Sequence, residues 1–310
     1  MAWLKLIRWP NLLIIFLTQF LVWLCIIGPA VWGETYLIHW KNFLLLTLST
    51  LFIAAAGYVI NDYFDIRIDA INRPEKVVLE TSIHRRNAIL LHIFLNVLGL
   101  LLALKVAHQA GQYQWLLLQL GTIVLLWFYS TQFKRQFIIG NLVVAMATAL
   151  SIQVPAIYEP ALRAYSFLDI FSANPINPLW LIAGYTFFAF MLTWMREIVK
   201  DMEDHIGDEA EGCETMPIKW GLKKTANFVQ RLSLITSVIL LLAGFYLLFH
   251  EVVLMGLYAI VVLMGTLGFW TLQLHKKSTI AHYAFLSNRL KWIMILGVGA
   301  LVINLANHYA

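Results

Sequence analysis

The sequence predicts an all-α protein, a polytopic membrane bundle of about nine transmembrane helices that form one domain over residues 1–310. Composition is the first reason: 61% of the residues are hydrophobic and 13% are charged, whereas about a quarter of the residues in soluble domains are charged. The second reason is that apolar stretches of about 20 residues recur along the chain. At about 1.5 Å per residue, a helix of that length crosses about 30 Å of hydrocarbon.

The first apolar stretch runs from Leu12 to Trp32 and follows Lys5 and Arg8. It is longer than the core of a signal peptide and no small-residue cleavage site follows it, so we expect the first membrane helix there. A loop from Glu159 to Pro178 contains several prolines and is expected to be irregular and external. The expected spans lie near residues 12–32, 43–61, 88–107, 113–131, 138–157, 179–199, 226–249, 252–273 and 290–308.

Lysine and arginine are concentrated in alternate connections between these spans. The poor connections hold only Lys41, Lys105 and Arg163. By the positive-inside rule, the N-terminus and the rich connections face the cytoplasm of a bacterial or archaeal-type inner membrane, and the C-terminus lies outside. The net charge of +5 is explained in this way, and no nucleic acid partner is expected. The rich connections contain Arg67, Arg73, Lys76, Arg85, Arg86, Lys134, Arg135, Lys200, Lys219, Lys223, Lys224, Lys276, Lys277, Arg289 and Lys291.

An acidic motif ends the second span. It consists of Asn61, Asp62, Asp65 and Asp69, which share roughly one face of a helix. Like charges at this spacing repel one another, so a cation is expected to compensate them. Oxygen ligands alone are typical of a hard divalent ion such as Mg²⁺. The alternative is a solvated acidic loop between two membrane helices.

A second acidic motif ends the sixth span and repeats the spacing of the first. Asp201, Asp204 and Asp208 form D-x-x-D-x-x-x-D, as do Asp62, Asp65 and Asp69. Two acidic helices that face each other can hold two Mg²⁺ ions with a diphosphate between them, an arrangement that stabilises charge on a leaving group. The alternative for this motif alone is a charged cytoplasmic loop.

A diphosphate also requires cations from the protein. Basic residues flank both acidic motifs, and two more follow the fourth span. Each of them could equally be a positive-inside residue. The candidates are Arg67, Arg73 and Lys76, then Arg196 and Lys200, then Lys134 and Arg135.

Together, the two acidic motifs and Asn72-Arg73-Pro74 resemble the UbiA superfamily of intramembrane prenyltransferases. The segment from Tyr129 to Lys134 is similar to the Y-x-x-x-x-K element of that family. Further matches are Arg8-x-x-Asn11, Gly140-Asn141 and Thr215-x-Pro217, so the resemblance extends over nearly the whole chain. The segment 75–82 departs from the proline- and glycine-containing turn that is usual in the family.

The resemblance implies a UbiA-like fold and Mg²⁺-dependent transfer of a polyprenyl group from its diphosphate to a hydrophobic acceptor, within the lipid bilayer. By position, Asn61, Asp62, Asp65 and Asp69 would serve one Mg²⁺, and Asp201, Asp204 and Asp208 the other. Asn61, Arg67, Arg73 and Lys200 would bind the prenyl diphosphate. The residues expected to be catalytic are Asp65, Asp69, Asp204, Asp208, Tyr129 and Lys134.

The segment from Arg196 to Asp208 looks most like the branch of geranylgeranylglycerol-phosphate geranylgeranyltransferases. The resemblance therefore implies a geranylgeranyl donor and a glycerol-phosphate ether lipid as acceptor. Arg85 with Arg86, or Lys223 with Lys224, could supply cations for that phosphate, and the plainer alternative is that they are charges at helix ends. The alternative acceptors are an aromatic acid and a quinone or haem precursor.

The sequence supports other functions less well. A cation-coupled transporter would carry its acids near the bilayer midplane, whereas these motifs stand at helix ends. A hydrolase or cyclase that acts on prenyl diphosphates without an acceptor stays open. Cys25 and Cys213 lack the spacing of a metal site or a disulfide framework and are expected to be ordinary thiols.

Overall fold

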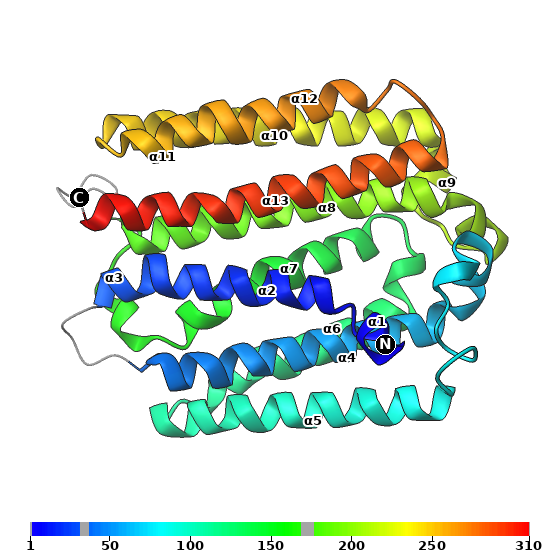
Figure 1. Cartoon of the computed structure of the whole chain (residues 1–310), viewed down its shortest axis with the longest axis horizontal. Coiled ribbons are helices and arrows are strands. Elements are labelled where there is room, and N and C mark those ends of the chain that lie inside the picture. The colour runs from blue at the N-terminus through cyan, green and yellow to red at the C-terminus, as the bar shows by residue number, and fades with distance from the viewer. Residues whose placement is uncertain (1, 32–36, 169–176, 310) are drawn as a thin grey trace.

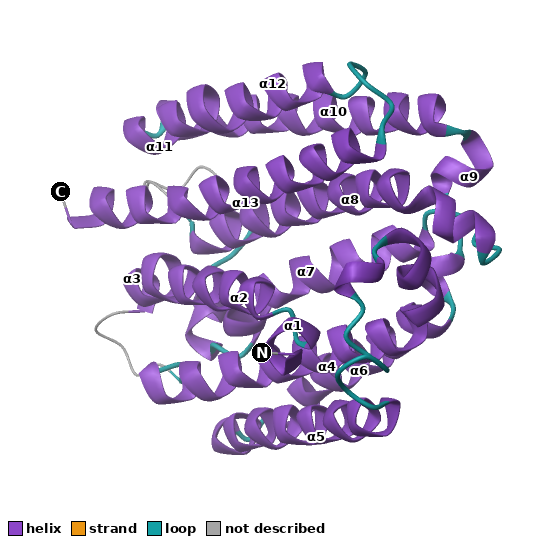
Figure 2. Ribbon diagram, turned by 45° about the vertical axis from the view of Figure 1, so that its right-hand side comes forward, coloured by secondary structure: helices purple, strands orange, loops and turns teal. Residues whose placement is uncertain are grey.

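The chain folds into a bundle of long helices that lie roughly side by side (Figures 1 and 2). The structure is a computed structural model, which describes residues 2–31, 37–168 and 177–309, without the side chains of residue 76 and of residues 304–309. Within these ranges nine helical segments are long and apolar enough to cross a membrane, which confirms the predicted number. They are Trp9–Val31, Trp40–Asn72, Arg85–Ala110, Tyr113–Thr131, Ile139–Ile157, Pro178–Ala210, Leu222–Phe249, Val253–Gln273 and Ile280–Ile303.

Several spans are built from more than one helical piece. The α-helices are α1 (Ala2–Leu6), α2 (Trp9–Val22), α3 (Gly28–Val31), α4 (Trp40–Asn72), α5 (Arg85–Ala110), α6 (Leu116–Thr131), α7 (Ile139–Ile157), α8 (Pro178–Ala210), α9 (Met216–Trp220), α10 (Leu222–Phe249), α11 (Val253–Leu257), α12 (Gly265–Gln273) and α13 (Ile280–Tyr309). The π-helical segments are η1 (Trp23–Ile27) and η6 (Tyr258–Met264). The short 3₁₀ helices are η2 (Pro74–Lys76), η3 (Tyr113–Trp115), η4 (Phe133–Arg135) and η5 (Pro160–Ala164).

The second and sixth spans are longer than expected. Helices α4 and α8 each contain 33 residues, which corresponds to about 50 Å, against about 30 Å of hydrocarbon. The apolar run marks the width of the bilayer, whereas the helix continues through the acidic motif. Helix α4 ends at Asn72 because Pro74 disfavours helical backbone at Arg73.

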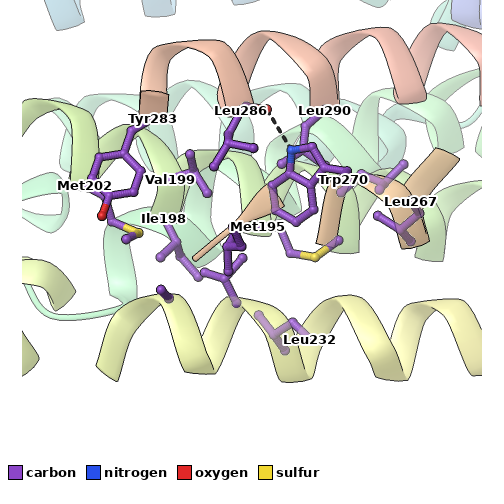
Figure 3. Close-up of a cluster of buried hydrophobic side chains, with 14 of the residues drawn as sticks. Met195, Ile198, Val199, Met202, Leu232, Leu267, Trp270, Tyr283, Leu286 and Leu290 are labelled. Carbon is purple, nitrogen blue, oxygen red and sulfur yellow. Dashed lines mark hydrogen bonds between the residues drawn. The ribbon is translucent and has the colours of Figure 1, made fainter. Parts of the chain in front are cut away.

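Helix α8 carries a different kind of residue on each side. Met195, Ile198, Val199 and Met202 recur at helical spacing and pack into a buried core with α10, α12 and α13 (Figure 3). In that core the indole of Trp270 donates a hydrogen bond of 2.9 Å to the Leu286 carbonyl. Packing of the apolar side turns the acidic side of α8 away from this core.

Helix α7 contains Pro155. Proline has no N–H, so the carbonyl of Ser151, four residues earlier, lacks its usual helical donor. The Gln19 side chain of α2 donates to that carbonyl at 2.7 Å, and Gln19 is fully buried. A side chain of one membrane helix thus completes the backbone hydrogen bonding of another.

The connection after α7 is partly helical, which corrects the expectation of an irregular loop between Glu159 and Pro178. Helix η5 begins directly after Glu159. The buried Glu159 carboxylate accepts hydrogen bonds from the backbone N–H groups of Leu37, Ile38 and Ala161 at 3.3, 2.8 and 3.0 Å. Residues 169–176 of this loop lie outside the described residues.

Candidate active site

The two acidic motifs lie at the same end of the bundle. Helices α4 and α8 run in the same direction, from left to right in Figure 1. Asp62 and Asp201 lie 22 and 23 residues beyond the first residues of their helices, Trp40 and Pro178. About 20 residues cross the hydrocarbon, so both motifs begin where their helices leave it.

Asn72 joins the ends of the two helices. Its side-chain amide donates to the Asp204 carbonyl at 3.0 Å, and its side-chain oxygen accepts from the Gly207 N–H at 2.9 Å. A Cβ at position 207 would lie 2.5 Å from the Asn72 amide nitrogen, so glycine there leaves room for the Asn72 side chain to make both bonds. Arg73 adds ion pairs of 2.8 Å to Glu203 and 2.7 Å to Asp204.

The acids of α4 meet cations from other helices. Asp62 forms an ion pair of 2.6 Å with Arg8, which stands between α1 and α2. Asp65 forms an ion pair with Lys134 of η4 and accepts a hydrogen bond of 2.8 Å from Asn61. Both members of the Asp65–Lys134 pair are largely buried, with side-chain exposures of 14% and 9%, so solvent screens this pair little.

A close approach positions Lys134. Helix η4 packs against the start of α7 at Gly140, where a Cβ would lie 2.8 Å from the Lys134 Cα. Glycine therefore lets the backbone of η4 come near α7 and directs the lysine toward α4.

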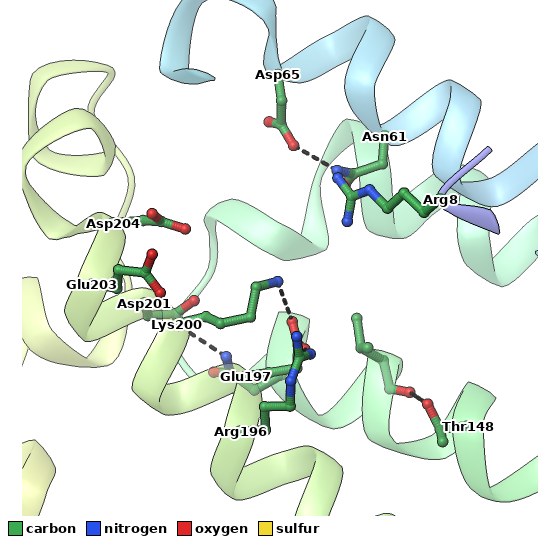
Figure 4. Close-up of polar contacts among 12 residues, drawn as sticks. Arg8, Asn61, Asp65, Thr148, Arg196, Glu197, Lys200, Asp201, Glu203 and Asp204 are labelled. Atoms are coloured by element: carbon green, nitrogen blue, oxygen red, sulfur yellow. Dashed lines mark hydrogen bonds and ion pairs between the residues drawn. The ribbon is translucent and has the colours of Figure 1, made fainter. Parts of the chain in front are cut away.

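Glu197 organises the acidic side of α8. It forms ion pairs with Arg196 at 2.7 Å and Lys200 at 3.0 Å (Figure 4). One turn further on, Asp201 accepts a hydrogen bond of 2.8 Å from Asn141 of α7. Because Glu197 is buried, it holds both cations in fixed positions.

Tyr129, Asp69 and Asp208 lie within the electrostatic field of both helices. The charges of Glu197, Asp65 and Asp201 all act on the Tyr129 hydroxyl. Asp69 interacts with Asp204, and Asp208 interacts with Asp65. The structure therefore gathers the predicted residues of α4, α6, η4 and α8 at one site, with the exception of Arg67.

The chemistry of the ligands suits a hard cation. In the described ranges no three His, Cys, Asp or Glu side chains converge as one metal-ligand set. Asp62, Asp65 and Asp204 are instead paired with Arg8, Lys134 and Arg73. The Asn61 side-chain oxygen, however, is buried and has no hydrogen-bond partner among the described residues. A buried carbonyl oxygen beside Asp65 fits an oxygen-coordinated divalent ion.

Arg67 is not brought to this site. It is exposed and makes no ion pair within the described residues. Two residues of a helix subtend about 200°, so Arg67 lies on the opposite side of α4 from Asp65 and Asp69.

The paired arginines and lysines considered as candidates for an acceptor phosphate also lie elsewhere, at helix ends. Arg86, Lys223 and Lys224 are exposed at the starts of α5 and α10. Arg85 is exposed too, with Glu80 at 3.8 Å.

The site contains residues that were not among those predicted: Arg8, Asn72, Asn141, Glu197 and Glu203. Arg8, Asn72 and Asn141 belong to the motifs Arg8-x-x-Asn11, Asn72-Arg73-Pro74 and Gly140-Asn141, so the sequence did contain a signal for these three residues. An open cavity of about 240 Å³ beside Asn72 and Arg73 is lined on the α8 side by Glu203 and Asp204.

Cys213 lies near Asp208, whose carbonyl accepts a hydrogen bond of 2.8 Å from the Cys213 N–H. Burial raises the pKa of the Cys213 thiol to about 11, so the thiol stays protonated near neutral pH. It is therefore a poor nucleophile and a poor metal ligand.

The fold and the site define a class: a polytopic helical membrane protein with two acidic helices and a set of cations at one end. The model of the UbiA prenyltransferase family matches residues 21–304. The chain therefore belongs to this family of prenyl-transferring enzymes, which confirms the resemblance seen in the motifs.

Two relatives illustrate the similarity. The digeranylgeranylglyceryl phosphate synthase of Saccharolobus solfataricus is 32% identical over 283 residues, which cover 90% of this chain and 89% of the relative. The synthase of the same name from Methanothermobacter thermautotrophicus is 33% identical over 217 residues, 69% of each chain.

Solved structures agree on the fold. A digeranylgeranylglyceryl phosphate synthase matches with a TM-score of 0.67, 24% identity and coverage of 98% of both chains. A UbiA homologue from Archaeoglobus fulgidus, bound to DMAPP and Mg²⁺, matches with a TM-score of 0.58 and 17% identity, over 97% of this chain and 99% of that one.

Proposed function

We propose that this protein transfers a geranylgeranyl group from its diphosphate to the glycerol phosphate of an ether lipid. Membership of the prenyltransferase family supports the reaction type. Relatives named digeranylgeranylglyceryl phosphate synthase, at 28–33% identity, support the donor and the acceptor. The observation that carries the proposal is the joining of two acidic helices by Asn72 and Arg73 at one end of the bundle.

The reaction exchanges one C–O bond for another. The bond between the allylic carbon and the diphosphate breaks, and its electron pair leaves with the diphosphate. The acceptor hydroxyl oxygen then bonds to the allylic carbon and gives up its proton, which the released diphosphate or water takes up. Charge therefore develops on the diphosphate and on the carbon, and the site must stabilise both.

Asn61, Asp62, Asp65 and Asp69 are proposed to hold one Mg²⁺, and Asp201, Asp204 and Asp208 a second. When bound, Mg²⁺ supplies positive charge to the leaving diphosphate. A solved UbiA homologue contains Mg²⁺ together with a prenyl diphosphate. The buried, unpartnered oxygen of Asn61 supports the same assignment in this chain.

Basic side chains of the protein are proposed to neutralise the rest of the negative charge on the diphosphate. Lys134 and Arg73 reach the carboxylates of Asp65 and Asp204, so each stands where a diphosphate on the metal-binding face would lie. Lys200 is held by Glu197 on the same side of α8. Tyr129, in the field of both acidic helices, is proposed to face the reacting carbon.

The acidic ends of α4 and α8 are proposed to lie on the cytoplasmic side. The connections at that end are rich in Lys and Arg, and this bias sets the orientation of membrane proteins. A water-soluble diphosphate product would then be released into the cytoplasm.

Purified protein in detergent, with radiolabelled geranylgeranyl diphosphate, Mg²⁺ and separate acceptors, tests the proposal. We expect label to pass to a geranylgeranylglycerol phosphate lipid and the transfer to stop with EDTA. Label passing to an aromatic acid or quinone precursor instead would change the acceptor. Release of diphosphate without a labelled acceptor would indicate a hydrolase or a cyclase, and absence of turnover with any donor would refute the proposed reaction.

A further inference from the structure

Lys291 is a cation inside a membrane-spanning segment. The sequence placed it in a connection rich in Lys and Arg, whereas the structure places it on α13, within the candidate span Ile280–Ile303. Its ammonium group donates to the Asn11 side-chain oxygen of α2 at 2.9 Å. Within the described part of the chain Lys291 forms no ion pair. A half-buried charge in such a segment is costly, and its usual role is to meet an ion or a substrate.

Two arginines lie close to Lys291 and Asn11. The charge of Arg196 acts on Lys291. Tyr58 interacts with both arginines and with the Asn11 side chain, and the Arg8 guanidinium stands 5.2 Å from the centre of the Tyr58 ring. Cations from the α1–α2 junction, α8 and α13 therefore gather around Asn11.

The charges in this group do not balance. Arg8 is paired with Asp62, and Arg196 shares Glu197 with Lys200. In addition, the Arg196 Nε atom is buried and has no hydrogen-bond partner among the described residues. A buried guanidinium N–H without an acceptor can donate a charge-assisted hydrogen bond to an oxygen of a bound group.

We propose that Lys291 and Arg196, with Asn11 as a neutral partner, bind the phosphate of the acceptor lipid. The inference rests on the proposed function and places the acceptor phosphate apart from the donor diphosphate. A phosphate monoester carries about −1.5 to −2 charges near neutral pH, which matches a lysine without a countercharge beside a partly satisfied arginine. Because α13 spans the membrane, the hydrocarbon tail of the acceptor can remain in the bilayer.

This site differs from the candidate cations that the sequence offered for the acceptor phosphate. Lys223 and Lys224 are exposed at the start of α10, where solvent would screen their attraction for a phosphate. Lys291 and Arg196 attract the phosphate more strongly because less water surrounds them.

The test compares two acceptors in the variants Lys291→Met, Lys291→Arg and Lys224→Met. One acceptor is geranylgeranylglycerol phosphate, and the other is the same lipid without its phosphate. We expect Lys291→Met to raise KM for the phosphate acceptor about tenfold to a hundredfold, as for the loss of one charged hydrogen bond. The KM values for the phosphate-free acceptor and for geranylgeranyl diphosphate should stay within about twofold of the wild type. Lys291→Arg should restore most of the affinity, and Lys224→Met should behave as the wild type.

Three outcomes would overturn the inference. An equal rise in KM for both acceptors in Lys291→Met would mean that Lys291 only supports the structure or binds lipid without recognising the phosphate. An unchanged KM for the phosphate acceptor in Lys291→Met, while the wild type turns it over, would refute the phosphate site but leave the proposed function intact. A wild type that transfers nothing to any acceptor would refute both.

A second variant and a binding assay guard against misfolding. If Lys291→Met does not fold, Arg196→Gln is measured in the same way, with the same expected rise in KM. Thermal shift of the protein by the phosphate lipid, without donor or Mg²⁺, should be weaker in either variant than in Lys224→Met.

Discussion

Substitution Gly207→Ala tests whether the link between α4 and α8 sets the geometry of the site. The new methyl group would stand 2.5 Å from the Asn72 amide nitrogen and 2.6 Å from its side-chain oxygen. Ordinary contacts between such atoms are about 3.5–4.0 Å. The Asn72 side chain must therefore retreat by about 1 Å, which breaks both of its hydrogen bonds to α8.

Each hydrogen bond contributes about 0.5–1.5 kcal/mol to the free energy of unfolding, so Gly207→Ala should cost about 1–3 kcal/mol relative to a glycine-to-alanine change on α8 without this contact. Catalysis should suffer more, because a displacement of about 1 Å between reacting groups can lower the rate about a hundredfold. Asn72→Ala removes the same two bonds and should resemble Gly207→Ala. Combined, the two changes should cost no more than either alone, since they remove one interaction.

Gly184→Ala is the matched control. Gly184 lies on the same helix, and a Cβ there meets nothing within 4 Å. Both changes gain the same helix propensity, about 0.5–1 kcal/mol, so a difference between them reports the contact with Asn72. The measurements are the melting temperature in detergent and kcat for prenyl transfer. If Gly207→Ala matches Gly184→Ala in both, the link does not position the site.

Three further predictions concern single side chains. Asp204→Asn should lower kcat about a hundredfold or more, because it removes several kcal/mol of stabilisation of the charge on the leaving diphosphate. The melting temperature should be nearly unchanged. Near-normal turnover would refute the assignment of Asp204 to the metal. Lys134→Gln should raise KM for the prenyl diphosphate about tenfold to a hundredfold, whereas Arg67→Gln should change it less than about twofold, and equal effects would contradict the register of α4. Gln19→Leu should destabilise the protein by about 1 kcal/mol. In a Pro155→Ala background it should destabilise the protein less, because that change restores an N–H to the carbonyl that Gln19 now satisfies. Equal thermal shifts in the two backgrounds would refute this account.

The positions of the helices and of the acidic motifs could be predicted from the sequence, because both are local patterns. A run of about 20 apolar residues marks a span wherever it occurs, and acids three and four residues apart share a helix face. Arg67 shows that a position within the motif does not by itself place a residue at the site. It lies within the motif in the sequence, yet the helical period alone turns it away from Asp65 and Asp69.

The partners of those acids were decided by the tertiary structure. Asp65 meets Lys134 across 69 positions, Arg73 meets Asp204 across 131, and Lys291 meets Asn11 across 280. Hydropathy and spacing describe single helices and contain no information about which faces of distant helices touch. Those contacts depend on close approaches such as the one at Gly140, where the backbone of η4 lies against α7, and the one at Gly207, where the Asn72 side chain lies against α8. The sequence alone therefore determined the membrane spans and the acids, and the packing of helices distant in sequence decided which cations stand beside those acids.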